Sequence, residues 1–121
     1  MAHELKRLEW VASARKDLKA FPREVQRTMG HALFEAQEGR KSPSAKPLSG
    51  FGGAGVLEII EDFQTNTYRA VYTVKFEKRV YVLHSFQKKS KRGIATPKTE
   101  IELIKRRLKL AEEHYEGLTQ R

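Results

Sequence analysis

Residues 67–86, TYRAVYTVKFEKRVYVLHSF, consist of two runs in which apolar side chains alternate with polar ones. Alternation with a period of two, together with many Val, Tyr and Phe residues, is typical of β-strands. Only Glu77 and Lys78 need lie between the runs, so we expect strands at 67–76 and 79–86 that pair as an antiparallel hairpin. Glu-Lys is a poor pair for a tight turn, which leaves the register open by about one residue.

A register that pairs Phe76 with Arg79 assigns each side chain of the hairpin to one face, because side chains alternate along a strand. The predicted core face is aromatic and aliphatic: Tyr68, Ala70, Tyr72, Val74, Phe76, Tyr81 and Leu83. The other face mixes polar and apolar residues, and we expect part of it to be open to solvent. On that face Arg69 lies opposite Phe86 and diagonal to His84, within reach of long side chains.

The segments on either side of the hairpin extend this pattern. Residues 56–60, VLEII, are apolar and β-branched and predict a further strand. From about Pro97 to Gly117, apolar residues recur at helical spacing, and Thr96 is placed to cap this helix. We therefore expect three consecutive strands followed by a C-terminal helix.

The N-terminal part predicts helices. Residues 5–11 suit a strand or the start of a helix, and we favour the strand. Ser13 is a suitable N-cap for a short helix over 13–20, and a second helix over 22–38 has one apolar stripe. The predicted fold class is α+β: a small antiparallel sheet with two N-terminal helices packed on it and a C-terminal helix, in a single domain spanning 1–121.

The loop at 39–55 contains Gly50, Gly52 and Gly55, which match the GxGxxG spacing of dinucleotide-binding proteins. That fingerprint requires a strand before it and a helix after it. Here the expected order is the reverse, so we interpret these residues as flexible glycines at the entrance of a strand and expect no nucleotide cofactor.

The composition restricts the function classes. The 121 residues carry a formal net charge of +9 and contain no cysteine, which excludes disulfides and thiolate metal sites. No apolar run approaches the roughly 18 residues of a membrane helix, and the first residues lack the apolar centre of a signal peptide. We expect a cytoplasmic protein with no membrane, metal or cofactor. The charge favours a polyanionic partner, with plain solubility as the alternative.

The positive charge is concentrated after the hairpin. Residues 86–98, FQKKSKRGIATPK, contain no acidic residue. The basic side chains of this segment are Lys88, Lys89, Lys91, Arg92 and Lys98. Gly93 and Pro97 indicate a loop. A solvated linker is one interpretation; a surface that binds nucleic acid is the other.

Arg69, His84, Lys88 and Lys89 are the candidate catalytic residues. Arginine and lysine bind phosphate oxygens, and histidine titrates near neutrality and can move a proton. Phe86 or Tyr81 offers a surface on which a base can stack, with Lys91, Arg92 and Lys98 as further nucleic-acid contacts. The alternative is structural: Arg69 pairs with Glu58 or Glu61, and His84 is a buried histidine of the sheet.

The segment from Tyr68 to Leu108 resembles the signature half of the RelE/ParE toxin superfamily, and is most similar to its phage-derived, HigB-like branch. The similarity includes Arg69 before an aromatic-rich stretch, the block LHSFQKK at 83–89 and TPK at 96–98. The upstream segments SARKDLKAFP, KPLSG and LEIIED are also similar, so the resemblance covers roughly residues 5–115.

The resemblance implies the toxin of a type II toxin–antitoxin pair, neutralised by a cognate antitoxin with a helix-turn-helix fold. RelE- and HigB-like members cleave mRNA, usually on the ribosome, whereas ParE-like members inhibit DNA gyrase. The resemblance assigns Arg69 to the scissile phosphate and matches Lys88 and Lys89 to basic positions, but it gives His84 no role. We expect a metal-independent endoribonuclease; the alternatives are a gyrase inhibitor and a non-catalytic nucleic-acid-binding module.

Overall fold

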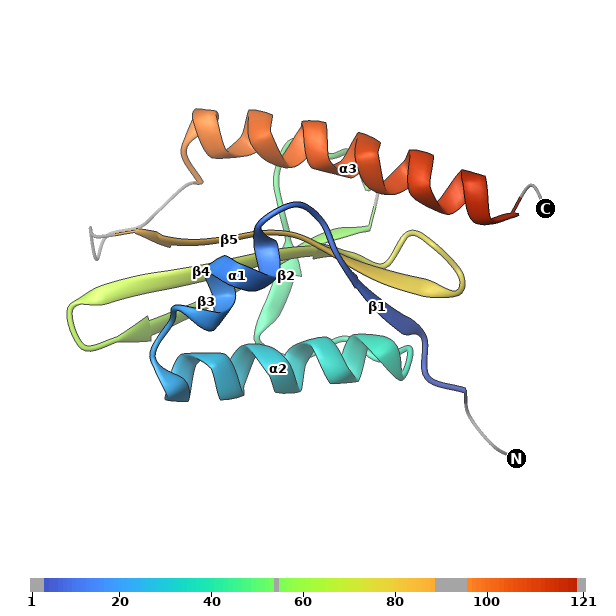
Figure 1. The fold of residues 1–121 in the computed structure, drawn as a ribbon. Helices are drawn as coiled ribbons and strands as arrows, with labels where there is room; N and C mark the ends of the chain where they lie inside the picture. The colour runs from blue at the N-terminus through green and yellow to red at the C-terminus, as the bar shows by residue number, and fades with distance from the viewer. Residues whose placement is uncertain (1–3, 54, 89–95, 120–121) are drawn as a thin grey trace.

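The structure is a computed structural model that describes residues 4–53, 55–88 and 96–119. One sheet lies between the helices (Figure 1). The elements in chain order are β1 (Arg7–Trp10), α1 (Ala14–Lys19), α2 (Arg23–Gln37), β2 (Ala45–Pro47), β3 (Val56–Phe63), β4 (Asn66–Thr73), β5 (Arg79–Lys88) and α3 (Lys98–Thr119).

The five strands form one sheet in the order β1-β5-β4-β3-β2. The strands β2 to β5 pair with antiparallel neighbours, whereas β1 pairs with β5 in parallel and forms one edge. The α+β class and the hairpin of β4 and β5 are confirmed. Two features were not expected: the parallel β1–β5 pair, which joins residues far apart in sequence, and the short edge strand β2 inside the predicted loop.

Helices cover both faces of the sheet, with α2 on one side and α3 on the other (Figure 1). The core under α2 contains apolar residues from both layers, among them Val25, Met29, Leu33, Ile59, Ala70, Tyr72, Val80 and Val82. The core under α3 contains Val71, Tyr81, Leu83, Phe86, Ile104 and Ala111. The face that we expected to be partly open to solvent is therefore covered, because the apolar stripe of α3 packs on it.

The register of the hairpin is as predicted at one end and shifted at the other. Arg69 pairs with Phe86, but the pairing shifts between Val71 and Tyr72, so that Leu83 has no partner on β4. This β-bulge moves Leu83 and Tyr81 to the α3 side, away from the core of Tyr72 to which they were assigned. An extra residue on one strand reverses the side-chain alternation beyond it, which explains the wrong assignment.

The glycine-rich loop leads from β2 into a strand, and no helix follows it. Gly55 has a φ of +71°, and a Cβ there would lie 3.1 Å from the backbone nitrogen of Lys75. Gly50 and Gly52 also have positive φ values. These glycines allow the chain to enter β3 beside the end of β4, in agreement with their interpretation as conformational residues.

Candidate functional site

A buried ion pair lies on the face of the sheet that α3 covers. Nη1 of Arg69 on β4 donates to Oε2 of Glu58 on β3 at 3.2 Å, and the two side chains are only 1% and 5% exposed. Thr96, just before α3, closes a triangle: its Oγ1 accepts from Arg69 at 3.0 Å and donates to Glu58 at 2.8 Å. Of the two carboxylates proposed as structural partners of Arg69, the structure selects Glu58.

The sheet register brings three predicted site residues to this face. Val71 pairs with both Glu58 and His84, and Arg69 pairs with Phe86, so these side chains form two adjacent rows under α3. The predicted proximity of Arg69, His84 and Phe86 is confirmed, but their exposure is not. Arg69 is fully buried and contacts Thr96, while His84 is 6% exposed and contacts Glu100 and Arg107 of α3.

His84 is held at both ring nitrogens. Nε2 lies 2.6 Å from Oε1 of Glu100 on α3, and Nδ1 lies 3.3 Å from Nη1 of Arg107. Because arginine only donates, Nδ1 accepts, and the proton of the neutral ring is on Nε2, directed at Glu100. Burial lowers the pKa of His84, although the hydrogen bond that His84 donates to Glu100 acts in the opposite direction. The ring is thus a neutral donor that positions the half-exposed Glu100.

Arg107 connects three elements and was not among the predicted site residues. Its guanidinium donates to the carbonyl oxygen of Leu83 at 3.0 Å and to Oγ of Ser13 at 3.2 Å, in addition to its contact with His84. Ser13 was expected to cap α1 with its hydroxyl; instead the hydroxyl donates to Asp17 at 2.8 Å, with no side-chain hydrogen bond to the helix backbone. Arg107 therefore ties α3 to β5 and to the start of α1.

The remaining predicted residues occupy different environments. Phe86 is 9% exposed and its ring stacks on His84, with centroids 4.8 Å apart, so it is not free to stack on a base in this conformation. Lys88 ends β5 opposite Thr67, and Lys98 is exposed at the first position of α3. Lys89, Lys91 and Arg92 lie outside the described residues, so their predicted contacts stay predictions.

A pocket of about 340 Å³ opens beside the triangle of Arg69, Glu58 and Thr96. Its polar lining comes from Glu58, Thr96, Lys46 and Ser49. Nearby, Nζ of Lys105 on α3 lies 6.0 Å from the ring centroid of Phe51 in the glycine loop. Sequence reasoning missed Lys46 and considered Glu58 only as a structural partner of Arg69. The two residues become neighbours only through the pairing of β3 with β2, a strand that was not predicted.

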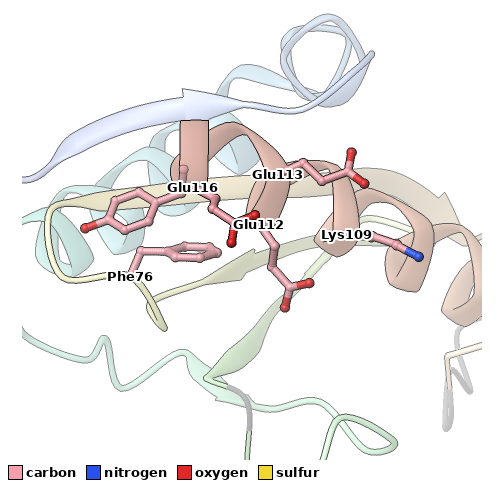
Figure 2. A pocket seen from close by; sticks show the side chains of 6 residues that line it. Phe76, Lys109, Glu112, Glu113 and Glu116 are labelled. Atoms are coloured by element: carbon pink, nitrogen blue, oxygen red, sulfur yellow. The ribbon is translucent and has the colours of Figure 1, made fainter. Parts of the chain in front are cut away.

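A larger pocket of about 550 Å³ lies at the other end of α3, and its lining is acidic. Figure 2 shows Glu112, Glu113 and Glu116 on the helix beside Phe76 and Lys109. Lys75 pairs with Glu112 at 2.6 Å, which offsets one of these charges. A cavity bordered by three carboxylates disfavours a polyanion, so the pocket beside Arg69 is the candidate site.

Neither a membrane span nor a metal centre is evident in the part of the chain that the structure describes. No helix there is both long and apolar enough to cross a bilayer. No three His, Asp or Glu side chains within the described ranges are grouped so that they could hold a metal ion.

The sheet order, the covered arginine and the C-terminal helix define a small basic protein of the RelE fold. A variant of Escherichia coli toxin RelE in the free state is similar, with a TM-score of 0.50 and 24% identity over 67% of this chain and 81% of that one. Residues 16–109 match the phage-derived protein Gp49-like family, to which this chain therefore belongs. The match confirms the expected phage-derived family, and the likeness to RelE confirms the expected fold.

Two further comparisons complete this result. The RelBE2 toxin–antitoxin complex of Mycobacterium tuberculosis has a chain with a TM-score of 0.47 and 20% identity, over 74% of this chain and 98% of that one. Among functionally curated proteins, none matches significantly.

Proposed function

We propose that this protein is the toxin of a toxin–antitoxin pair and that it inhibits translation by cleaving mRNA on the ribosome. The fold shared with a RelE toxin supports the first part. The observation that carries the second part is the pocket beside the Arg69–Glu58–Thr96 triangle, with Lys46 in its lining and Lys98 exposed two residues beyond Thr96. Fixed polar groups next to basic side chains suit a phosphodiester substrate.

In the proposed reaction the 2′-hydroxyl of the RNA attacks the adjacent phosphorus and the 5′-oxygen leaves. Basic side chains neutralise the charge that develops on the phosphate: Lys88 and Lys98, with Lys89, Lys91 and Arg92 as further candidates. Glu100 is the candidate acceptor of the 2′-hydroxyl proton, because His84 donates to it and is itself held by Arg107. The nucleophile belongs to the substrate, so the scheme requires no metal or cofactor.

Arg69 has a positioning role in this conformation. Its guanidinium contacts Glu58 and Thr96, and the residue has no exposed surface. A direct contact with a scissile phosphate requires the groups that cover Arg69 to move aside. As the structure stands, Arg69 acts on the pocket by fixing the carboxylate of Glu58.

The proposal includes a cognate antitoxin, for which we expect a helix-turn-helix fold. A net charge of +9 predicts that the contact surface of this partner is acidic, and charge complementarity accelerates association. The site of action is the cytoplasm, where ribosomes translate mRNA.

Expression of the chain without a partner tests the proposal. Wild type is expected to stop growth and to cleave mRNA, and Arg69→Lys to lose most of this effect, because a lysine cannot reproduce the two directed hydrogen bonds of the guanidinium. Arg79→Lys is the matched control, since Arg79 pairs with Glu9 at another edge of the sheet. DNA breaks with intact mRNA would instead indicate gyrase inhibition, and a folded but harmless wild-type protein would indicate a binding module.

A further inference from the structure

The pocket beside the buried triangle presents an acid and a base side by side. Lys46 and Glu58 are directly paired across β2 and β3, so their side chains leave the sheet on the same face, and both line the pocket. Among the described residues they form no ion pair with each other; Glu58 is paired with Arg69 instead. Lys46 is exposed, so its ammonium is available to a ligand.

The carboxylate of Glu58 keeps acceptor capacity on its second oxygen. Both hydrogen bonds that it accepts from described residues, from Arg69 and Thr96, end on Oε2. A carboxylate offers about four lone-pair sites on its two oxygens. The two contacts hold the group in place, so it meets a ligand without losing side-chain freedom.

We propose that this pocket binds a guanine base, with Glu58 accepting hydrogen bonds from N1–H and N2–H and Lys46 donating to O6. The source of the guanine is the RNA substrate, so the inference rests on the proposed function. A volume of about 340 Å³ lies within the range of small-ligand sites. Leu48 and Ile101 supply apolar surface for the ring, and Ser49 adds a hydroxyl beside them.

The same pattern disfavours the other bases. Adenine presents an amino donor where guanine has O6, and this donor would meet the Lys46 ammonium, while its N1 acceptor would meet the Glu58 carboxylate. Cytosine has the same conflict, and uracil offers a single N–H between two carbonyl oxygens. A buried acceptor left unpaired destabilises binding, so each mismatch weakens the complex.

Titration of the full-length protein with nucleoside monophosphates, followed by NMR, tests this assignment. Guanosine 3′-monophosphate is expected to bind about tenfold to a hundredfold more tightly than adenosine 3′-monophosphate. The amide signals of Glu58 and Ile101 should shift. Equal binding of the two nucleotides, or shifts confined to other surfaces, would overturn the proposal.

Two variants test whether this pocket is responsible for the preference for guanine. Glu58→Gln replaces an acceptor by an amide and should abolish the preference for guanine, but it also removes the partner of Arg69. Lys46→Met leaves that buried pair intact and should weaken guanosine 3′-monophosphate about tenfold, with no such loss for adenosine 3′-monophosphate, whose amino group no longer meets the ammonium. Lys41→Met is the matched control, because Lys41 is an exposed lysine outside this pocket. A preference retained in Lys46→Met would contradict the proposed contact to O6.

The RNA trinucleotides UGU and UAU distinguish RNA from a free nucleotide as the ligand. Tighter binding of UGU than of guanosine 3′-monophosphate assigns the site to RNA, whereas the reverse order would overturn the RNA-reading role. If mRNA is cleaved with no preference for guanine, this inference fails while the proposed function stands. If guanine binds but no mRNA is cleaved, the proposed function fails instead.

Discussion

Nη1 of Arg69 and Oε2 of Glu58 lie 3.2 Å apart on the face of the sheet that α3 covers, and both side chains are almost completely buried. Substituting only one residue of a buried ion pair destabilises the fold, because the remaining charge has neither a partner nor water around it. The pair therefore links the stability of the fold to the geometry of the candidate site.

Removing one member of this pair is expected to destabilise the protein strongly. Glu58→Leu should lower the free energy of unfolding by about 3–5 kcal/mol, since the Arg69 guanidinium is left without a counter-charge. The double variant Glu58→Leu/Arg69→Met should recover much of the loss, because no buried charge remains. Urea unfolding measures both; a single variant as stable as wild type would contradict the account.

The stability of the protein is expected to fall in mild acid because of His84. Burial lowers its pKa in the folded state, so the unfolded chain takes up the proton first as the pH falls below about 6.5. The free energy of unfolding should decrease by up to about 1.4 kcal/mol per pH unit from there down to the folded-state pKa.

His84→Gln should flatten this slope, whereas His31→Gln, which removes an exposed imidazole from α2, is the control. Denaturant unfolding at a series of pH values provides the measurement. Identical slopes in wild type and His84→Gln would show that another group is responsible.

Tyr72 carries a buried hydroxyl for which no hydrogen-bond partner is found among the described residues. Burial, with a smaller contribution from Glu35, raises its pKa to about 12. Tyr72→Phe removes the unsatisfied hydroxyl and leaves the ring in the core, so it should stabilise the protein by about 1 kcal/mol. Thermal and urea unfolding test this; a clear loss of stability would mean that the hydroxyl has a partner in solution.

Arg107 is expected to hold α3 on the sheet. Arg107→Lys loses the planar fork that reaches Leu83, His84 and Ser13, and should lower the free energy of unfolding by about 1–3 kcal/mol. Arg106→Lys, at the exposed neighbouring position, should have little effect. Hydrogen exchange would report faster opening of α3 in Arg107→Lys alone, and equal rates in the two variants would refute this role.

The strands and helices other than β2 were predictable because they depend on local patterns. Alternation placed Arg69 opposite Phe86, and helical spacing located α3. The bulge at Leu83 was not predictable, since one extra residue in a strand leaves no mark in an apolar run. The pairing of β1 with β5 was equally hidden, because it joins segments about 70 residues apart.

The sequence predicted several residues of the candidate site better than it predicted their surroundings. The sequence indicated that Arg69 and His84 share a face, but only the packing of α3 shows that both are buried. Thr96 was expected to cap a helix, whereas its hydroxyl contacts Arg69 and Glu58. These contacts depend on tertiary packing, which short-range spacing does not specify.

The most direct test of the central claim is the chemistry of RNA ends produced by purified protein from a defined mRNA on ribosomes. Attack by the 2′-hydroxyl predicts a 5′-hydroxyl on one product and a 2′,3′-cyclic or 3′-phosphate on the other, with no cut where the attacking nucleotide is 2′-deoxy. Products that carry a 5′-phosphate, or an intact mRNA in the presence of folded protein, would contradict the account.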